Sequence, residues 1–550
     1  MGKRYALLAV PAIVLLAAAL RIWGIGWGLP TEQHYFSYHP DETTILFSAM
    51  KLNLFAGEFN PGFYNYGSLY IFLVSIAAVF GSLFGLINIP SEDVFSKIGE
   101  VAKLYMSGRL IAFALGMLTV YLVYLLGKRA YGRRAGLIAA LFMAILPIHV
   151  MHSEFLAVDV PATFFVTLAL LFAVRIPEGH RLRDYLLSGL CAGLAAGTKY
   201  NAGLVIISPI VAHLVSHRAR PILRVLSPKL WAVVLMGAAG FLIGTPGAIL
   251  DYGRFSHDFA YEVLHARTGH GLVFAHTGSG FVYHIMHSLW PGMGLPLLIL
   301  GGIGIIYALV RRTPADLALM AFAVVYYAVI GIAQVRFARY TIPLLPVMVI
   351  LGARPVGEIL SITSRGFFAR AARGLTAIIL IAIVGYTLFY SLALDRVMAS
   401  QDTRDQAARW IKDNIPAGST IAFPTIPWFY TPPLDPYFGL PLPSERLDRI
   451  AEVTDYSLVV DANAEWNADF LVRESPQYVV LSEFEYVDRE RIKDRAYESY
   501  SAVLKKDYHL VREFSDPPSL LEFRVPLIPR LPHDMSYASP TILVYGRNDG

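Results

Sequence analysis

The sequence contains little of what soluble proteins use to stabilise and dissolve a fold. Cys191 is the single cysteine, so no intramolecular disulfide is possible and any outer domain must fold without covalent cross-links. Charged residues make up 16% of the chain, whereas soluble domains carry about 25%. Because 55% of the residues are hydrophobic, the composition excludes a soluble globular protein and indicates a polytopic membrane protein.

Several common functional signatures are also absent. There is no Walker motif, no CxxC pair, no nucleophile elbow and no internal repeat, and the glycine cluster at residues 24–28 does not follow a strand as a dinucleotide fingerprint would. The net charge of +5 does not indicate a nucleic-acid partner, because the basic residues form short tracts between apolar segments. These tracts are Lys3-Arg4, Lys128-Arg129, Arg133-Arg134, Arg181–Arg183, Arg218–Arg224, Arg311-Arg312 and Arg365–Arg373. This distribution is typical of cytoplasmic loops.

Apolar segments long enough to span a bilayer predict about eleven transmembrane helices. They are Tyr5–Leu29, Gly108–Leu126, Ala135–His152, Pro161–Ile176, Tyr185–Thr198, Asn201–Ser216, Leu230–Leu250, His284–Leu309, Leu317–Gln334, Pro343–Ile359 and Leu375–Leu394. Tyr70–Ile89 is ambiguous. If it crossed the membrane, the basic turn at residues 128–134 would lie outside, so we interpret it as a juxtamembrane or re-entrant element. The N-terminus is then inside and the C-terminal region outside.

The composition changes at about Leu394, which predicts a membrane domain over residues 1–394 and a soluble domain over residues 395–550. Asp402–Asn414 has the pattern of an amphipathic helix. Thr420–Phe423, Tyr478–Leu481 and Ile542–Tyr545 are predicted strands, so an α/β or α+β domain is expected. Pro424–Pro443 is expected to form a long loop.

Unusual polar residues fall on the outer side of this topology. Asp41 and Glu42 follow the first span directly after Pro40, where charges are costly unless they lie in polar surroundings or act in chemistry. The other members of the set are Arg109, Asp159, Lys199, Arg336, Arg339 and Tyr340. Each has a simpler explanation, since a lone cation at a helix end usually snorkels and the acids could cap helices. Their placement on one side favours a polar cavity open to the outer leaflet.

Six of the fifteen histidines lie between His257 and His287. Glu262 and His265 are three residues apart and could bind a metal from one helix face, but this spacing alone is weak evidence. An outer loop with ordinary histidines that lies over the cavity is the favoured interpretation. No metal or other cofactor is required by the sequence, although converging Asp41, Glu42 and Asp159 could hold a divalent ion.

At these residues the chain resembles the GT-C glycosyltransferases, in particular the phospholipid-carrier-dependent branch with protein O-mannosyltransferases and lipid A aminoarabinose transferases. The resemblance covers about Met1 to Ile359 and, more loosely, the C-terminal domain. Its motifs are Asp41-Glu42, Arg109-Leu110-Ile111, Tyr131-Gly132-Arg133-Arg134, His152-Ser153 through Asp159-Val160-Pro161, Gly197-Thr198-Lys199 and Arg339-Tyr340-Thr341-Ile342-Pro343. Asn65-Tyr66-Gly67-Ser68 departs from the family, because many relatives carry Lys-Pro-Pro or His-Pro-Pro there.

The resemblance implies a polyprenyl-phosphate-linked sugar as donor and a hydroxyl of a glycan, lipid or protein as acceptor. It implies an enzyme embedded in the inner (plasma) membrane whose site and C-terminal domain are extracytoplasmic. An acceptor hydroxyl needs a base during attack, a role expected for Asp41 with Glu42 orienting it. Asp159 is expected to orient the acceptor or tune Asp41, although a retaining mechanism with Asp159 as nucleophile stays open.

The leaving lipid phosphate needs cationic stabilisation, for which Lys199, Arg336, Arg339 and Arg109 are candidates, with Tyr340 bonding the phosphate or stacking on the sugar. Tyr66 and His265 are assigned to the acceptor site or a lid. The alternative functions are a secondary transporter or lipid flippase, and a membrane-anchored binding protein. Transporters usually place charges near the bilayer midplane within inverted repeats, and neither feature is visible here.

Overall fold

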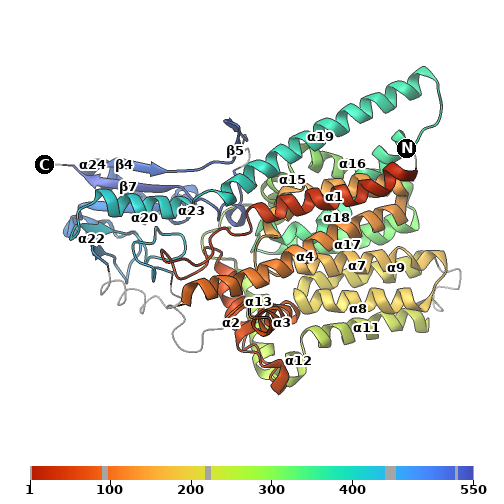
Figure 1. Ribbon diagram of the computed structural model, residues 1–550, viewed down its shortest axis with the longest axis horizontal. Helices are drawn as coiled ribbons and strands as arrows, with labels where there is room; N and C mark the ends of the chain where they lie inside the picture. Colours follow the sequence, from red (N-terminus) through yellow and green to blue (C-terminus); the bar gives the residue numbers. More distant parts are fainter. Residues whose placement is uncertain (1–2, 89–96, 217–223, 440–453, 527–529, 549–550) are drawn as a thin grey trace.

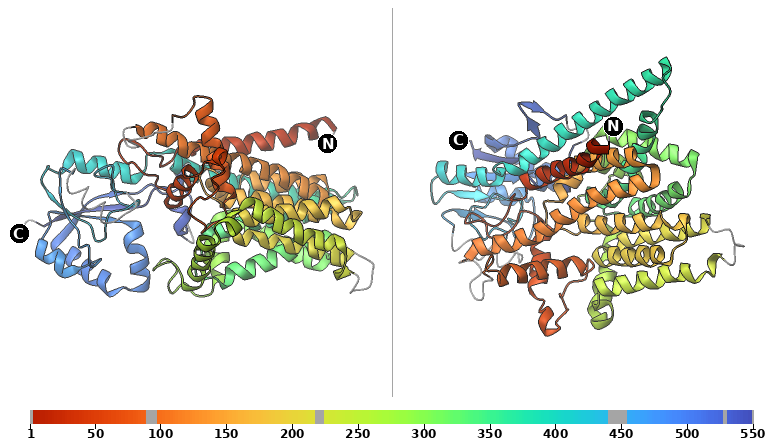
Figure 2. Two further views of the ribbon diagram at one scale, coloured as in Figure 1. Left: turned by 90° about the horizontal axis from the view of Figure 1, so that it is seen from below. Right: turned by 45° about the vertical axis from the view of Figure 1, so that its right-hand side comes forward.

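The computed structural model describes residues 3–88, 97–216, 224–439, 454–526 and 530–548. A bundle of long helices forms one end of the molecule and a sheet-containing domain the other (Figures 1 and 2). The bundle helices are α1 (Lys3–Trp23), α4 (Ile98–Tyr131), α5 (Arg133–Ala144), α6 (Pro147–His152), α7 (Asp159–Ala173), α8 (Leu182–Thr198), α9 (Ile207–Ser216), α11 (Pro228–Gly244), α16 (Leu295–Arg311), α17 (Pro314–Ile332), α18 (Leu345–Leu360) and α19 (Phe367–Ala399).

Shorter elements connect the bundle to the outer domain. They are α2 (Pro40–Met50), α3 (Leu69–Leu83), α12 (Gly247–Leu250), α13 (Tyr252–Thr268), α14 (Gly280–Tyr283), the π-helical turn η5 (His284–Leu289), α15 (Trp290–Met293), and the 3-10 helices η1 (Leu54–Ala56), η3 (Ile176–Glu178), η4 (Tyr200–Ile206) and η6 (Ala338–Leu344). In Figure 1, α3 is seen nearly end-on, whereas α4, α7 and α8 lie across the page. The segment that was ambiguous in the sequence therefore lies crosswise to the bundle.

The membrane-protein fold is confirmed. Within the described residues, five helical segments are long and apolar enough to cross a membrane, and a sixth is obtained if the bent pair Gly280–Met293 and Leu295–Arg311 forms one span. Leu8–Trp23, Leu69–Leu83, Tyr200–Ser216 and Pro228–Gly244 are shorter apolar helices. The count of about eleven spans includes such shorter segments and stays a prediction.

Proline and glycine divide segments that the hydropathy pattern joins. The predicted span Ala135–His152 is split into α5 and α6 before Pro147, which cannot donate a helical hydrogen bond. The predicted span His284–Leu309 is interrupted at Gly294, which adopts φ +77°, and the chain bends there by 119°. A positive φ is accessible to glycine without the steric cost that other residues would incur.

The bundle packs closely enough that small residues are required at one interface. Helices α8 and α11 approach through Gly189, Gly193 and Gly237, and a Cβ added to Gly193 would lie 2.0 Å from the Gly237 carbonyl oxygen. Small residues allow such backbone approach between apolar helices, where the hydrophobic effect gives little help inside a membrane. Phe142, Met143 and Val347 are fully buried in the core formed by α5 and α18.

The C-terminal domain contains the predicted sheet. Its strands are β1 (Thr420–Ala422), β2 (Ser457–Val459), β3 (Tyr478–Ser482), β4 (Tyr508–Phe514) and β7 (Ile542–Arg547), in the order β2-β1-β3-β7-β4. Strands β2, β1 and β3 are parallel, and β7 is antiparallel to both β3 and β4. The remaining elements are α20 (Thr403–Asn414), α22 (Ala468–Glu474), α23 (Glu483–Ile492), α24 (Arg495–Asp507), η7 (His533–Met535) and the hairpin β5 (Ser519–Leu520) with β6 (Phe523–Arg524).

The sequence pattern located β1, β3 and β7 but missed β2, which has three residues, and β4, whose middle residues are exposed on the sheet edge and include charged side chains. Helix α20 follows the predicted amphipathic segment, with Asp402 as its N-cap. Helix α19 continues through residue 394, the predicted domain boundary, and ends at Ala399. Part of the predicted Pro424–Pro443 loop, residues 440–443, lies outside the described residues.

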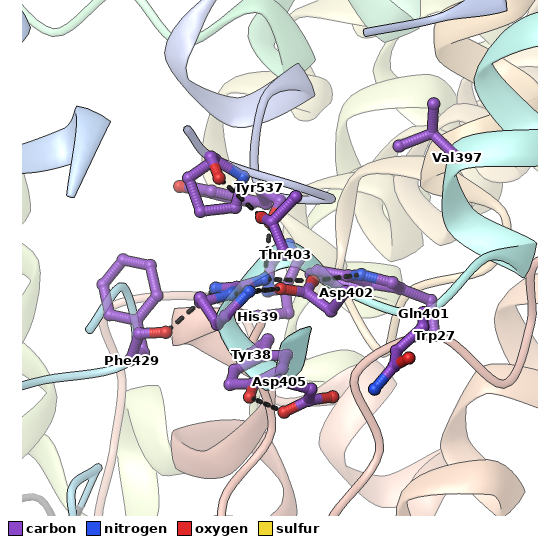
Figure 3. A network of polar contacts seen from close by, with 12 residues as sticks. Trp27, Tyr38, His39, Val397, Gln401, Asp402, Thr403, Asp405, Phe429 and Tyr537 are labelled. Carbon is purple, nitrogen blue, oxygen red and sulfur yellow. Dashed lines mark hydrogen bonds and ion pairs between the residues drawn. The ribbon is translucent and has the colours of Figure 1, made fainter. Parts of the chain in front are cut away.

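The first outer loop is joined to the C-terminal domain by a buried polar network (Figure 3). The Trp27 indole Nε1 donates to Asp402 at 3.0 Å, and the Tyr38 hydroxyl donates to Asp405 at 2.5 Å. Arg404 lies over the Tyr38 ring at 3.7 Å and donates to the Phe429 and Tyr537 carbonyls. This network holds the segment just before Asp41 against the outer domain.

Candidate active site

The acidic pair lies in the first turn of helix α2, as the helix-start interpretation of the sequence predicts, although neither acid is the N-cap. His39 is the N-cap, Pro40 occupies the first turn, and the Asp41 backbone N–H donates to His39 Nδ1 at 3.3 Å. Proline is favoured at this position because the first N–H groups of a helix have no intrahelical partner. Asp41 and Glu42 are neighbours in the chain, yet their side chains enter different surroundings.

Glu42 is fully buried and forms a closed cluster with Arg109. Arg109 Nε and Nη2 donate to the two carboxylate oxygens at 2.9 and 2.7 Å. The Leu156 backbone N–H and the Ser37 hydroxyl donate to the same carboxylate at 2.7 and 2.5 Å. Burial alone raises the pKa of Glu42, but Arg109 and Ser37 outweigh it and hold that pKa below its usual value.

Arg109 was a candidate for binding the donor phosphate, but in the structure its guanidinium group is buried against Glu42. Its Nη1 donates to the carbonyls of Ile25 and Trp27 at 2.7 and 2.6 Å, and its side chain is inaccessible. With Nε and both terminal nitrogens engaged, Arg109 ties α4 to the first outer loop and to α2. The pair fixes the start of α2, which carries Asp41.

Asp41 instead faces an open site. Its Oδ2 lies 3.0 Å from Arg339 Nη2, and its side chain is 24% exposed, compared with 6% for Arg339. Arg339 comes from the 3-10 helix η6 that precedes α18. The ion pair joins the first outer loop to the turn after α17, two segments that are far apart in the sequence.

A second acid–base pair lies beside this one. Lys199 Nζ donates to Asp159 Oδ1 at 2.6 Å, and Asp159 Oδ2 lies 4.0 Å from Arg339 Nε. The Lys199 ammonium also lies over the Tyr340 ring, 4.2 Å from its centroid. The structure thus brings Asp41, Asp159, Lys199, Arg339 and Tyr340 into one continuous group.

The C-terminal domain completes the group with residues that the sequence analysis did not identify. Asp534 accepts hydrogen bonds from the backbone N–H groups of Ala338 and Arg339 at 3.0 and 2.8 Å, and its Oδ2 lies 3.8 Å from Arg339 Nη1. Arg339 Nη1 also donates to the Tyr537 hydroxyl at 3.5 Å. Asp534 caps η6 from almost two hundred residues away, so no local sequence signal could have revealed it.

A cavity of about 370 Å³ lies in front of Asp41 and Arg339. Its walls also include Tyr66, Tyr340 and His265, three residues that the sequence analysis assigned to the site. The C-terminal domain and its preceding loop contribute Trp428, Phe429, Tyr430, Phe484, His533 and Tyr537. The cavity is therefore enclosed by both domains, with carboxylate and guanidinium groups on one wall and aromatic rings on the other.

Arg336 lies outside this cavity lining. Its Nη1 donates to the Thr277 hydroxyl and the Gly278 carbonyl at 2.7 and 2.8 Å, and Nη2 donates to Gln334 at 3.2 Å. These contacts secure the loop between α13 and α14. The structure thus separates Arg336 from Arg339, although the two residues are close in the sequence.

The histidine-rich segment forms one rim of the cavity. His265 and His270 share a hydrogen bond of 3.0 Å, and the Asn65 amide donates to Glu262 at 2.7 Å. Burial raises the pKa of Glu262 above its usual value and lowers that of His270. Within the described residues, no group of three or more His, Cys, Asp or Glu side chains has a metal-binding arrangement.

Known proteins share this fold and part of this sequence. Residues 95–243, which include α4 to α11, match the family model described as dolichyl-phosphate-mannose-protein mannosyltransferase. Among solved structures, the apo oligosaccharyltransferase of Archaeoglobus fulgidus aligns over 96% of this chain and 76% of its own, with 16% identity and a TM-score of 0.51. ArnT from Cupriavidus metallidurans bound to undecaprenyl phosphate aligns over 99% of this chain and 98% of its own, with 14% identity and a TM-score of 0.48. No curated protein matches.

The resemblance stated from the sequence motifs is confirmed. The family match covers the helices that carry Arg109, Asp159 and Lys199, and the fold likeness extends over both domains. Over residues 95–243 the chain is thus similar to a family of lipid-phosphate-sugar-dependent glycosyltransferases, and its overall fold is like that of a membrane oligosaccharyltransferase.

Proposed function

We propose that the protein transfers a sugar from a polyprenyl-phosphate carrier to an acceptor hydroxyl, with inversion and with Asp41 as general base. One observation carries the assignment of the base. Asp41, Glu42 and Asp159 are the three acids that the sequence suggests for catalysis. Asp41 lines the cavity with a partly exposed carboxylate, whereas Glu42 and Asp159 are 0% and 2% exposed. A general base must come within hydrogen-bond reach of the hydroxyl proton, and the Asp41 side chain has that access.

The acceptor chemistry requires such a base. An alcohol is not ionised at neutral pH, so its proton must be removed as the oxygen attacks the anomeric carbon. A positioned carboxylate contributes typically about 10²–10⁴-fold to such a step. Arg339, 3.0 Å from Asp41, fixes the direction of the carboxylate in the free enzyme. Proton transfer to Asp41 then accompanies formation of the new glycosidic bond.

The donor phosphate is assigned to Arg339 and Lys199. The leaving group of a polyprenyl-phosphate sugar is already acidic, so charge stabilisation helps it more than protonation does. Arg339 lines the cavity and presents a guanidinium fork suited to phosphate. Lys199 is not among the lining residues; it lies behind Tyr340 and adds positive charge to the group through Asp159, which contacts both cations. Tyr340 lines the cavity beside both cations and is placed to contact the phosphate or the sugar. The description of the matching family model, which names a dolichyl-phosphate sugar, supports this donor class.

Inversion is favoured by the position of Asp159. A retaining reaction requires a nucleophile that can reach the anomeric carbon and form a covalent intermediate. Asp159 is held by Lys199 at 2.6 Å, its side chain is 3% exposed, and it is absent from the cavity lining. Its surroundings suit a residue that orients Lys199 and Arg339. A single displacement with Asp41 as base accounts for the arrangement without a covalent step.

The extracytoplasmic location and the inner (plasma) membrane are part of the same proposal. The N-terminus, with Lys3-Arg4, and the turn between α18 and α19, with Arg365, lie at the end of the bundle opposite the sheet domain (Figure 1). Positively charged loops favour the cytoplasmic side. The cavity and the C-terminal domain would then face away from the cytoplasm.

The test is a transfer assay with purified protein and polyprenyl-phosphate mannose as donor, in which release of polyprenyl phosphate is measured. Asp41→Asn should lower turnover by about 10²–10⁴-fold. Donor binding and thermal stability should be retained. Glu58→Gln is the matched control, because Glu58 is an exposed acid in the same outer region of the chain. Full turnover in Asp41→Asn would remove Asp41 as the base.

A further inference from the structure

A second, larger cavity lies beside the first one. Its volume is about 570 Å³, and it is formed between helix α23 and the segment 530–536 on one side and residues 273–287 on the other. Val273, Phe484 and His533 line both cavities. The two spaces therefore adjoin at these three side chains, and Asp41 lines the first cavity only.

We propose that this second cavity binds the acceptor, and that the acceptor is a saccharide without anionic groups. The inference rests on the proposed function, because it places the attacking molecule next to the donor site. Three observations support it: the charge balance of the cavity, the unpartnered nitrogen of His533, and the absence of a strand edge among its walls.

The charges of the second cavity do not suit a phosphate or another anion. Glu483 pairs with Arg530 at 2.5 Å, and Asp488 pairs with Arg491 at 3.0 Å. Arg491 also donates to the carbonyls of Leu272 and Val273 at 2.8 and 3.1 Å. Glu490 adds a further acid to the lining, so the acids outnumber the arginines. Because both arginines of this lining are paired with acids, the second cavity favours a neutral ligand, whereas the first cavity offers Arg339.

His533 offers an unused hydrogen-bonding atom at the boundary. Its Nδ1 is buried and has no hydrogen-bond partner among the described residues. Burial lowers the pKa of His533 to about 4, so the imidazole is neutral at physiological pH and Nδ1 either donates or accepts one hydrogen bond, depending on the tautomer. A hydroxyl group can form that bond in either case. Phe484 packs against His533 with ring centroids 4.8 Å apart and, with Tyr283, provides apolar ring surface for the C–H faces of a sugar.

A peptide acceptor is less well matched. An extended peptide is commonly bound by an exposed strand edge, which supplies backbone hydrogen bonds at regular intervals. The second cavity is walled by α23, by η7 with its flanking residues, and by α14 with η5, and none of its lining residues in the described part of the chain belongs to a strand. Side-chain hydroxyl, carboxylate, imidazole and guanidinium groups, which suit the hydroxyl pattern of a saccharide, face the space instead.

The test uses the full-length protein in detergent on an array of neutral oligosaccharides, with sialylated oligosaccharides and serine- or threonine-containing hexapeptides on the same surface. Binding of undecaprenyl phosphate is measured in parallel. Val487→Trp fills the cavity from α23, and Val487→Ile is the matched control. His533→Phe keeps the ring packing but removes the nitrogens. Melting temperature and gel-filtration profile confirm that each variant is folded.

The expected result is that some neutral oligosaccharides bind, that Val487→Trp and His533→Phe weaken this binding at least tenfold, and that Val487→Ile leaves it unchanged. Undecaprenyl phosphate binding should be the same in both Val487 variants, because Val487 lines only the second cavity. The inference is overturned if only sialylated glycans or peptides bind, if nothing on the array binds, or if Val487→Trp leaves saccharide binding intact. Failure of the proposed function has a different signature, namely undecaprenyl phosphate binding that is absent or survives Arg339→Ala.

Discussion

Two ion pairs that begin at adjacent residues have opposite characters. The Glu42–Arg109 pair is closed, because both side chains are inaccessible to solvent. The Glu42 carboxylate accepts four hydrogen bonds from three residues that lie outside α2. The Asp41–Arg339 pair is open, because the Asp41 carboxylate is 24% exposed on the wall of a cavity. A buried pair with all its polar atoms satisfied stabilises a framework, whereas an exposed carboxylate can exchange its partner for a substrate.

The largest effect is expected when the closed pair is broken. Glu42→Gln leaves the buried Arg109 without a counter-charge, which should lower the free energy of unfolding by about 3–5 kcal/mol. The measurement is the thermal unfolding of purified protein, together with the yield of monodisperse material. Asp41→Asn should unfold close to the wild-type temperature. Similar losses in both variants would remove the distinction between a closed and an open pair.

A double substitution sharpens the same point. Replacing a buried ion pair by neutral groups of similar volume is often close to neutral for stability. Glu42→Gln combined with Arg109→Met should therefore recover part of the stability that either single substitution loses. A double variant that is no better than the single ones would indicate that the hydrogen bonds to Ile25, Trp27 and Leu156, rather than the charge pair, dominate.

A smaller effect is expected for the cation of the open pair. Arg339→Lys keeps the charge but removes the fork, so affinity for undecaprenyl phosphate should fall by about 10- to 100-fold. Arg336→Lys is the control, since Arg336 contacts the loop at Thr277 and Gly278 and is absent from the lining of the cavity that contains Asp41. Affinity can be measured by titration in detergent. If Arg336→Lys is the more damaging change, the phosphate site has been assigned to the wrong arginine.

The smallest effect concerns the rim of the open site. Burial raises the pKa of Glu262, so its proton is bound more tightly in the folded state and this stabilisation is lost as pH rises through the folded pKa. Glu262→Gln carries no such loss. The variant should match the wild type in melting temperature below about pH 4, near the unfolded pKa, and exceed it slightly at pH 8. A constant difference across this range would assign the effect to the Asn65 hydrogen bond instead.

Much of the organisation was predictable because it depends on composition and local pattern. Apolar segments and a change in composition indicated a helical membrane region followed by a sheet-containing C-terminal region, and short apolar segments located β1, β3 and β7. Breaks at Pro147 and Gly294 were harder to place, because hydropathy averages over a window and does not register one missing N–H or one positive φ. Strand β4 was missed because its exposed middle lacks the apolar alternation.

The sequence by itself determined which polar residues lie between the apolar segments, and so which side of the molecule carries them. Only the tertiary structure decided which acid faces the cavity. Successive residues of a helix point about 100° apart, so packing of α2 against α4 sends Glu42 to Arg109 and leaves Asp41 to Arg339. The same holds for Asp534 and Tyr537, which reach Arg339 because the outer domain folds over the bundle. Such contacts arise between distant segments, and no local pattern encodes them.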